Sequence, residues 1–208
     1  IASGSRAPLS VQTGVFMNNT KRVVLYALLT AIVLLMGFTP IGYLRTGVLS
    51  ITFLSVPVIV GAMLLGIGGG AVLGAVFGLT SFIQALMGDF FGATLLSINP
   101  LYTAILCFVP RILAGIGCAL SFNALKGKAR YVLSSLCAPL LNTVLFTVTL
   151  VLLFGKSDYI VNMRAGKNLL SFFAAFVGIN GLIEAVVCTI VGSAVGAAIF
   201  KYAKRFDK

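Results

Sequence analysis

The sequence predicts an all-α membrane protein with six transmembrane helices and both termini on the cytoplasmic side. The prediction depends on the composition, on six apolar runs, and on where the basic residues lie. Of the 208 residues, 60% are hydrophobic and only 9% are charged, and the mean hydropathy is +1.12. Soluble domains usually have about 25% charged residues. So few polar side chains cannot cover a water-facing surface, and the lipid bilayer must therefore surround most of the chain.

Six apolar runs approach or exceed the length of about 20 residues that a helix needs to cross a membrane. They cover residues 23–39, 48–65, 70–87, 100–125, 132–154 and 169–200. Because lipid offers no partner to unpaired backbone groups, each run is expected to be helical. The connection between the second and third runs is so short that their helices should form a close hairpin. Glycines recur there at every fourth position, on one helical face, which favours close packing of another helix: Gly66, Gly70, Gly74 and Gly78.

The basic residues predict the orientation of the helices. With the N-terminus inside, the inner segments carry nine Lys and Arg residues, and the outer loops 40–47, 88–99 and 155–168 carry four. Such an excess is typical of cytoplasmic segments, so both termini are predicted to lie inside. Residues 1–16 lack a long apolar core and are expected to be an appended or disordered segment. Residues 17–208 are expected to form a single domain.

Polar side chains inside the predicted spans are costly to place in lipid and therefore mark candidate binding residues. Arg111, Asn142 and Glu184 fall near one membrane level when depth is counted at about 1.5 Å per residue. Two interpretations stay open: a structural ion pair between Arg111 and Glu184, or a polar pocket open to the outside. Pro110 should free a backbone carbonyl near Arg111. The candidate substrate-binding residues are Tyr43, Arg45, Gln84, Asn99, Tyr102, Arg111, Asn142, Asn180 and Glu184.

The residues around position 100 predict a helix start, because Asn is a good N-cap and Pro suits the first helical position. Enzymatic chemistry is not indicated. The chain has no histidine, its four cysteines form no CxxC pair, its four acidic residues are scattered, and no Walker A motif occurs. We therefore expect no catalytic residue, metal or cofactor. The net charge of +11 comes without the aromatic-basic pattern of single-strand binders, so nucleic acid is not an expected partner.

Several segments together resemble a known family. They are the pair Ala27 and Ala31 in the first apolar run, the stretch ITFLSVPVIVGAMLLGIGGGAVLGAVFGLTSFIQAL, and the shorter stretches INPLYTAILCFVPRILAG and INGLIEAVV. With the six predicted spans, they make residues 20–205 similar to the S components of energy-coupling factor (ECF) transporters. These are the membrane subunits that capture vitamins. The Pro-Arg-Ile-Leu and Asn-Gly-x-x-Glu runs are similar to the branch with pantothenate, pyridoxine and hydroxymethylpyrimidine carriers.

The resemblance implies a substrate-binding subunit of an ABC importer in the bacterial cell membrane. Such a subunit captures a water-soluble vitamin outside with high affinity. It then docks on a T component driven by two ATPase subunits, which implies docking through Ala27 and Ala31, and it topples in the membrane. The outer loops 40–47 and 88–99 would act as lids.

Pantothenate is the expected cargo, because its carboxylate, hydroxyls and amide suit Arg45 or Arg111 together with the asparagines. Pyridoxine or pyridoxal, hydroxymethylpyrimidine or another B vitamin is the alternative, with rings stacked on Phe90, Phe91, Tyr43 or Tyr102. An alternative of another class is a small oligomeric channel or membrane assembly protein, for which the glycine-rich helix faces are the evidence.

Overall fold

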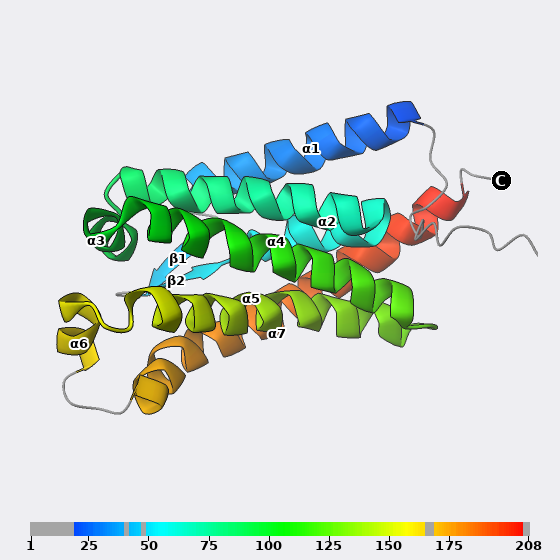
Figure 1. The fold of residues 1–208 in the computed structure, drawn as a ribbon. Coiled ribbons are helices and arrows are strands. Elements are labelled where there is room, and N and C mark those ends of the chain that lie inside the picture. Colours follow the sequence, from blue (N-terminus) through cyan, green and yellow to red (C-terminus); the bar gives the residue numbers. More distant parts are fainter. Residues whose placement is uncertain (1–18, 40–41, 47–48, 165–168, 206–208) are drawn as a thin grey trace, which may run out of the picture.

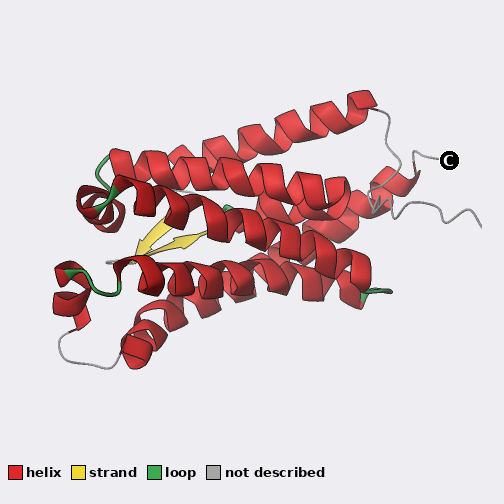
Figure 2. Cartoon of the chain, in the orientation of Figure 1, coloured by secondary structure: helices red, strands yellow, loops and turns green. Residues whose placement is uncertain are grey.

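The computed structural model describes residues 19–39, 42–46, 49–164 and 169–205, and within them the chain is almost entirely helical (Figures 1 and 2). Residues 1–16 lie outside this part. The long helices run side by side and form one bundle. In chain order the elements are α1 (Asn19–Phe38), β1 (Tyr43–Thr46), β2 (Leu49–Thr52), α2 (Ser55–Leu86), α3 (Phe90–Ile98), α4 (Pro100–Ala124), α5 (Ala129–Phe154), α6 (Asp158–Arg164) and α7 (Leu169–Arg205).

Among the described residues, five helices are long and apolar enough to cross a membrane: α1, α2, α4, α5 and the segment Gly181–Ile199 of α7. Helices α1, α4, α5 and α7 coincide closely with four of the six apolar runs. The prediction of a helical membrane protein is thereby confirmed. The remaining two apolar runs both fall largely in α2, which has 32 residues.

Helix α2 is divided by Gly66, whose φ of 71° and ψ of −154° are not helical. A side chain added at Gly61 would collide with Leu73, although residues twelve positions apart on a straight helix are about 18 Å apart. The chain therefore reverses at Gly66, and the arms 55–65 and 67–86 pack against each other as the short connection predicts. Glycine is suited to this turn because its missing Cβ permits a positive φ.

A β-hairpin precedes α2, where the sequence predicts a loop and the start of a helix. Strands β1 and β2 pair antiparallel with Tyr43 opposite Thr52. The prediction of a helix from residue 48 is therefore wrong, and the first arm of α2 has eleven residues, about 16 Å of helix. Ile51 and Thr52 are β-branched and favour a strand, but a short apolar run cannot by its hydropathy be assigned to strand or helix.

Two further segments predicted as loops contain helices. Within 88–99, α3 begins after Asp89, whose side chain accepts a hydrogen bond from the Gly92 backbone N–H at 3.3 Å. The preceding residue, Gly88, has a φ of 93° and makes the turn out of α2. Within 155–168, α6 adds about two turns. The prediction of these segments as loops is wrong because hydropathy does not report short capped helices.

The glycine stripe of α2 packs against α4. A Cβ at Gly74 would lie 2.5 Å from the Arg111 carbonyl oxygen, and one at Gly78 would lie 2.8 Å from that of Cys107. One turn earlier, Gly70 faces the backbone of Gly115. The two helices thus touch backbone to backbone at Gly70, Gly74 and Gly78, as the glycine spacing predicts, and this contact sets the position of α4. The prediction of Gly66 on the same helical face is wrong, because Gly66 makes the turn.

The two ends of the bundle differ in composition. Figure 1 shows the start of α1, the α4–α5 connection and the end of α7 at one end, and α3 and α6 at the other. The first end has a group of basic residues: Lys21, Arg22, Lys126, Lys128, Arg130 and Lys201.

Candidate binding pocket

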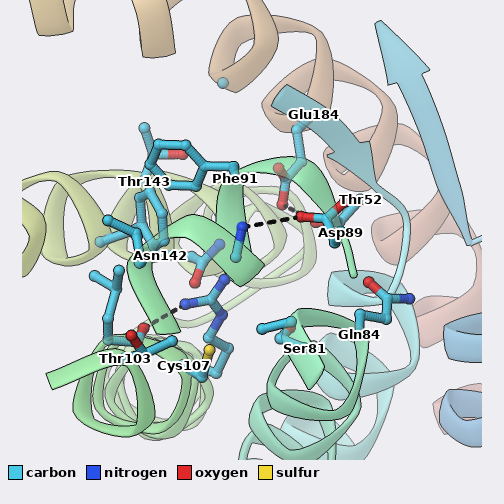
Figure 3. Close-up of a pocket in the computed structure, with 17 residues that line it drawn as sticks. Thr52, Ser81, Gln84, Asp89, Phe91, Thr103, Cys107, Asn142, Thr143 and Glu184 are labelled. Atoms are coloured by element: carbon cyan, nitrogen blue, oxygen red, sulfur yellow. Dashed lines mark hydrogen bonds between the residues drawn. The ribbon is translucent and has the colours of Figure 1, made fainter. Parts of the chain in front are cut away.

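A cavity of about 150 Å³ lies in the half of the bundle that contains α3 (Figure 3). Residues from β2 and from helices α2, α3, α4, α5 and α7 line it, so it is enclosed by segments far apart in the sequence. Its polar lining consists of Thr52, Ser81, Gln84, Asp89, Thr103, Cys107, Arg111, Asn142, Thr143 and Glu184. Its apolar lining consists of Ala85, Phe91, Gly92, Leu95, Leu106, Phe146 and Gly181.

Arg111 is held in place by the proline before it. Pro110 has no N–H to donate to the carbonyl of Leu106, four residues earlier. The Arg111 Nη1 donates to that carbonyl instead, which confirms the expected freed carbonyl. The guanidinium carbon lies 5.5 Å from the centre of the Phe77 ring and 5.0 Å from that of Phe146, close enough for cation–π attraction. The Arg111 Nε is buried without a hydrogen-bond partner.

Glu184 of α7 is held by hydroxyl groups. Its Oε1 accepts hydrogen bonds from Ser55 Oγ at 2.9 Å and from Thr52 Oγ1 at 3.1 Å. The carboxylate thereby joins α7 to β2 and α2. The direct ion pair with Arg111, one of the two sequence interpretations, is not formed between these described side chains. The pocket, the other interpretation, contains both residues.

Asn142 of α5 completes the floor of the pocket. Its side chain is 9% exposed, and its Oδ1 has no hydrogen-bond partner. A void of about 10 Å³ beneath it, shared with Arg111 and Ser55, has room for roughly one water molecule. Arg111, Asn142 and Glu184 therefore line the same pocket, as their common depth predicts.

The other sequence candidates have different places. Gln84 lines the pocket, and its Nε2 donates to the carbonyl of Gly37 in α1. Asn99 is the N-cap of α4: its side chain accepts from the backbone N–H groups of Leu101 at 3.0 Å and Tyr102 at 3.2 Å. The Tyr102 ring is 39% exposed and packs edge-on against Phe154 at 6.0 Å. Neither Asn99 nor Tyr102 lines the pocket. The side chains of Tyr43, Arg45 and Asn180 lie outside the described part.

Several pocket residues are not among the sequence candidates. The polar ones, apart from Asp89, are small hydroxyl or thiol side chains, which do not interrupt an apolar run and so give no hydropathy signal. A helical period would have found two of them, because Thr103 and Cys107 lie eight and four residues before Arg111 and thus share its helix face. Thr52 gives no such signal, because its position depends on a strand that the sequence does not predict.

Helix α3 covers the pocket. Phe91 and Leu95, four residues apart, turn their buried side chains to the cavity and are 7% and 1% exposed. The segment expected to be a lid loop is therefore a helix with an apolar inner face. Phe91 also contacts Tyr159 of α6, with ring centres 6.3 Å apart.

Comparison with known proteins identifies this architecture. Residues 21–195 match the family model "ECF transporter, substrate-specific component". The chain is 29% identical to "Pantothenate transporter PanT" of Leuconostoc mesenteroides, over 90% of this chain and 96% of that protein. It is also 29% identical to "Pantothenic acid transporter PanT" of Lactococcus lactis, over 72% of this chain and 78% of that protein. Because this model covers most of its length, the chain belongs to the family of substrate-specific components of ECF transporters, which are multi-pass membrane transport proteins and not enzymes.

Proposed function

We propose that this substrate-specific component binds pantothenate at the outer face of the membrane and delivers it inward after docking on a T component with two ATPase subunits. The choice of pantothenate as cargo depends on the position of Arg111. It is a cation on the floor of a pocket, its Nε is unpartnered, and no acidic side chain neutralises it directly. The names of the two relatives favour the same vitamin.

The chemistry of pantothenate fits the lining of the pocket. The planar fork of an arginine matches a carboxylate with two parallel hydrogen bonds. Asn142 and Thr143 on α5 suit the amide, and Glu184 and Gln84 suit the hydroxyls. Among the described lining residues Arg111 is the one cation, so it is the place where the carboxylate of a substrate would bind, away from Asp89 and Glu184. A neutral ring vitamin would leave this charge without a partner.

We propose six membrane crossings with both termini in the cytoplasm. The reversal at Gly66 lets the two arms of α2 cross separately, the first together with the β-hairpin. Non-helical backbone is tolerated at this depth where it lines a cavity, and Thr52 at the end of β2 does so. The basic end of the bundle is then cytoplasmic by the charge rule, and the pocket and α3 lie in the outer half.

Docking is proposed on α1. Ala27 and Ala31 are exposed on this helix, whereas Leu29, Val33 and Gly37 face inward. This exposure favours docking over packing within the chain, which is the other explanation for the alanine pair. Small exposed residues allow a second helix to approach closely, as a T component would.

Isothermal titration of the detergent-purified chain against a panel of B vitamins tests the cargo. The panel contains pantothenate, pyridoxine, pyridoxal, hydroxymethylpyrimidine, thiamin and riboflavin. We expect one-to-one binding of pantothenate without ATP. If only a ring vitamin bound tightly, that vitamin and not pantothenate would be the cargo. If no vitamin of the panel bound, a vitamin-binding role would be contradicted.

A further inference from the structure

We propose that the pocket is electrically polarised and therefore holds pantothenate in one orientation, with its carboxylate on Arg111 and its hydroxyl-bearing end on Glu184. From this orientation it follows that Glu184 excludes ligands that are anionic at the hydroxyl end, such as a phosphate ester. The inference rests on the proposed function and assigns a specificity role to one residue.

The Arg111 side of the pocket is suited to an anion. Besides the bond to Leu106, the guanidinium makes ring contacts with Phe77 and Phe146 and forms no direct ion pair with a described carboxylate. The neighbouring Asn142 is more than nine-tenths buried, and its Oδ1 has no hydrogen-bond partner. Two adjacent buried side chains with unused hydrogen-bonding atoms are costly unless a ligand or water satisfies them.

The Glu184 side has the opposite sign. Figure 3 shows Glu184, Thr52 and Asp89 gathered on one side of the cavity, and Asn142, Thr103 and Cys107 on the other. Both carboxylates are held by donors from the protein: Glu184 by two hydroxyls and Asp89 by the Gly92 N–H. The carboxyl oxygens on this side accept hydrogen bonds from the protein, so this side favours ligand groups that donate.

Hydroxyl groups meet this requirement and phosphate groups do not. A hydroxyl that donates to a buried carboxylate makes a charge-assisted hydrogen bond. A phosphate ester in the same place adds about two negative charges at neutral pH, and repulsion is strong where water is excluded. Because Glu184 is tied to β2 and α2 through Thr52 and Ser55, it cannot swing away without breaking both bonds.

The orientation has a consequence for transport. A vitamin that is phosphorylated on its hydroxyl end after delivery would no longer fit the pocket. The pocket would therefore not rebind such a product.

Competition binding with matched ligands tests the inference. The ligands are pantothenate, panthenol (an alcohol in place of the carboxylate), the phosphate ester of the terminal hydroxyl and the neutral acetate ester of the same hydroxyl. For the wild-type chain we expect the phosphate ester to bind at least about a hundred-fold more weakly than pantothenate. The acetate ester should bind at least ten-fold more tightly than the phosphate ester, since it adds bulk without charge. Equal rejection of both esters would overturn the inference.

Two variants then test which of the two residues, Glu184 or Arg111, binds which end of pantothenate. Glu184→Gln keeps the shape and an oxygen that accepts from Thr52 and Ser55, and it should reduce the penalty on the phosphate ester to about ten-fold or less. It should leave the preference for pantothenate over panthenol unchanged, whereas Arg111→Met should abolish that preference. The opposite assignment, with Glu184→Gln removing the panthenol preference, would overturn the orientation. Wild-type protein that does not bind pantothenate would instead reject the proposed function, and the ester comparison on wild type remains decisive if a variant fails to fold.

Discussion

The side chain of Arg111 is positioned by a backbone hydrogen bond that is missing from its own helix. Pro110 leaves the Leu106 carbonyl without its helical partner, and the arginine takes that place through Nη1. One of its nitrogens is thus used to fix the side chain, while Nε keeps no partner. The proline and the arginine therefore act as a unit in which the first positions the second.

Replacing Arg111 with methionine should weaken pantothenate binding by about 3 kcal/mol, roughly a hundred-fold, because the buried carboxylate would lose its charged partner. Arg111→Lys should recover only part of this loss, since lysine cannot form the bidentate fork. Titration calorimetry measures both. Arg130→Met is the matched control: it removes an arginine that also stacks on a ring, that of Phe122 at 3.7 Å, but at the other end of the bundle. Equal losses in the Arg111 and Arg130 variants would contradict the role of Arg111.

Asn99 is expected to serve α4 and not the substrate. Asn99→Ala removes the acceptor for the Leu101 and Tyr102 N–H groups and should lower the free energy of unfolding by about 1 kcal/mol. Asn99→Asp keeps a capping oxygen and should restore stability with unchanged pantothenate affinity. Thermal unfolding and calorimetry on the two variants check this. If the Asn99→Asp variant were stable but bound pantothenate much more weakly, Asn99 would have to contact the substrate.

The sequence predicts the charged and amide residues of the pocket that lie inside the apolar runs, but not Asp89, which follows one of them. Arg111, Asn142, Glu184 and Gln84 are visible because an intramembrane polar group is rare and costly. Asn99 was also singled out, but a capping side chain has the same residue type as a binding one. Thr52 and Ser55 are not predicted, because hydroxyls are common in apolar runs and only the contact of these two with Glu184 marks them.

At the scale of elements, the contact between α2 and α4 determines where the site residues lie. The carbonyls of Arg111 and Cys107 face Gly74 and Gly78, so the spacing of α4 from α2 depends on glycine. Both residues also line the pocket. Any side chain added at these glycines displaces the wall that carries the arginine.

Gly74→Ala should therefore lower both stability and affinity. Its Cβ would meet the Arg111 carbonyl oxygen at 2.5 Å and the Ile112 Cα at 3.0 Å, and backbone cannot move aside cheaply, so we expect about 1–3 kcal/mol of destabilisation. The control is Gly68→Ala on the same helix, where the nearest atom is the Tyr26 hydroxyl at an ordinary 3.4 Å. Thermal unfolding and pantothenate titration of both variants measure the effect. Equal losses in the Gly68 and Gly74 variants would show that the close contact with α4 is not responsible, since alanine by itself favours a helix over glycine.

The elements themselves could be predicted where hydropathy and length agree. The long helices α1, α4, α5 and α7 each need about 20 apolar residues and have them. The β-hairpin and α3 could not be predicted, because a strand of four residues and a helix of nine leave no long-range period, and the β-hairpin depends on tertiary contacts such as Thr52 with Glu184.

For the whole molecule, the exposed alanines of α1 separate docking from binding. Replacing Ala27 and Ala31 together with leucine should abolish vitamin uptake and co-purification with the T component, because bulky side chains prevent close helix approach. Pantothenate binding should persist. The matched control is the pair Val144 and Val148 on α5, also exposed and four residues apart, whose replacement with leucine should affect neither. Loss of binding in the alanine variant would contradict a docking role.

The six-crossing arrangement can be tested by labelling single cysteines in a variant without the four native cysteines. Gly68→Cys, next to the reversal of α2, should react with a membrane-impermeant thiol reagent from the cytoplasmic side only, as should Lys128→Cys in the α4–α5 connection. Lys156→Cys, just after α5, should react only from outside. All three positions are exposed. A Gly68 variant shielded from both sides would mean that α2 crosses as one helix.

The backbone-to-backbone contact of α2 with α4 also limits how this protein can open. Sliding between packed helices relies on side chains that change rotamer to absorb small shifts, and along Gly70, Gly74 and Gly78 no such layer lies between the two backbones. Helices α2 and α4 are therefore expected to move together as one rigid body. Room for a vitamin to enter is therefore expected at α3, the helix that covers the pocket between the positive-φ Gly88 and the extended Asn99.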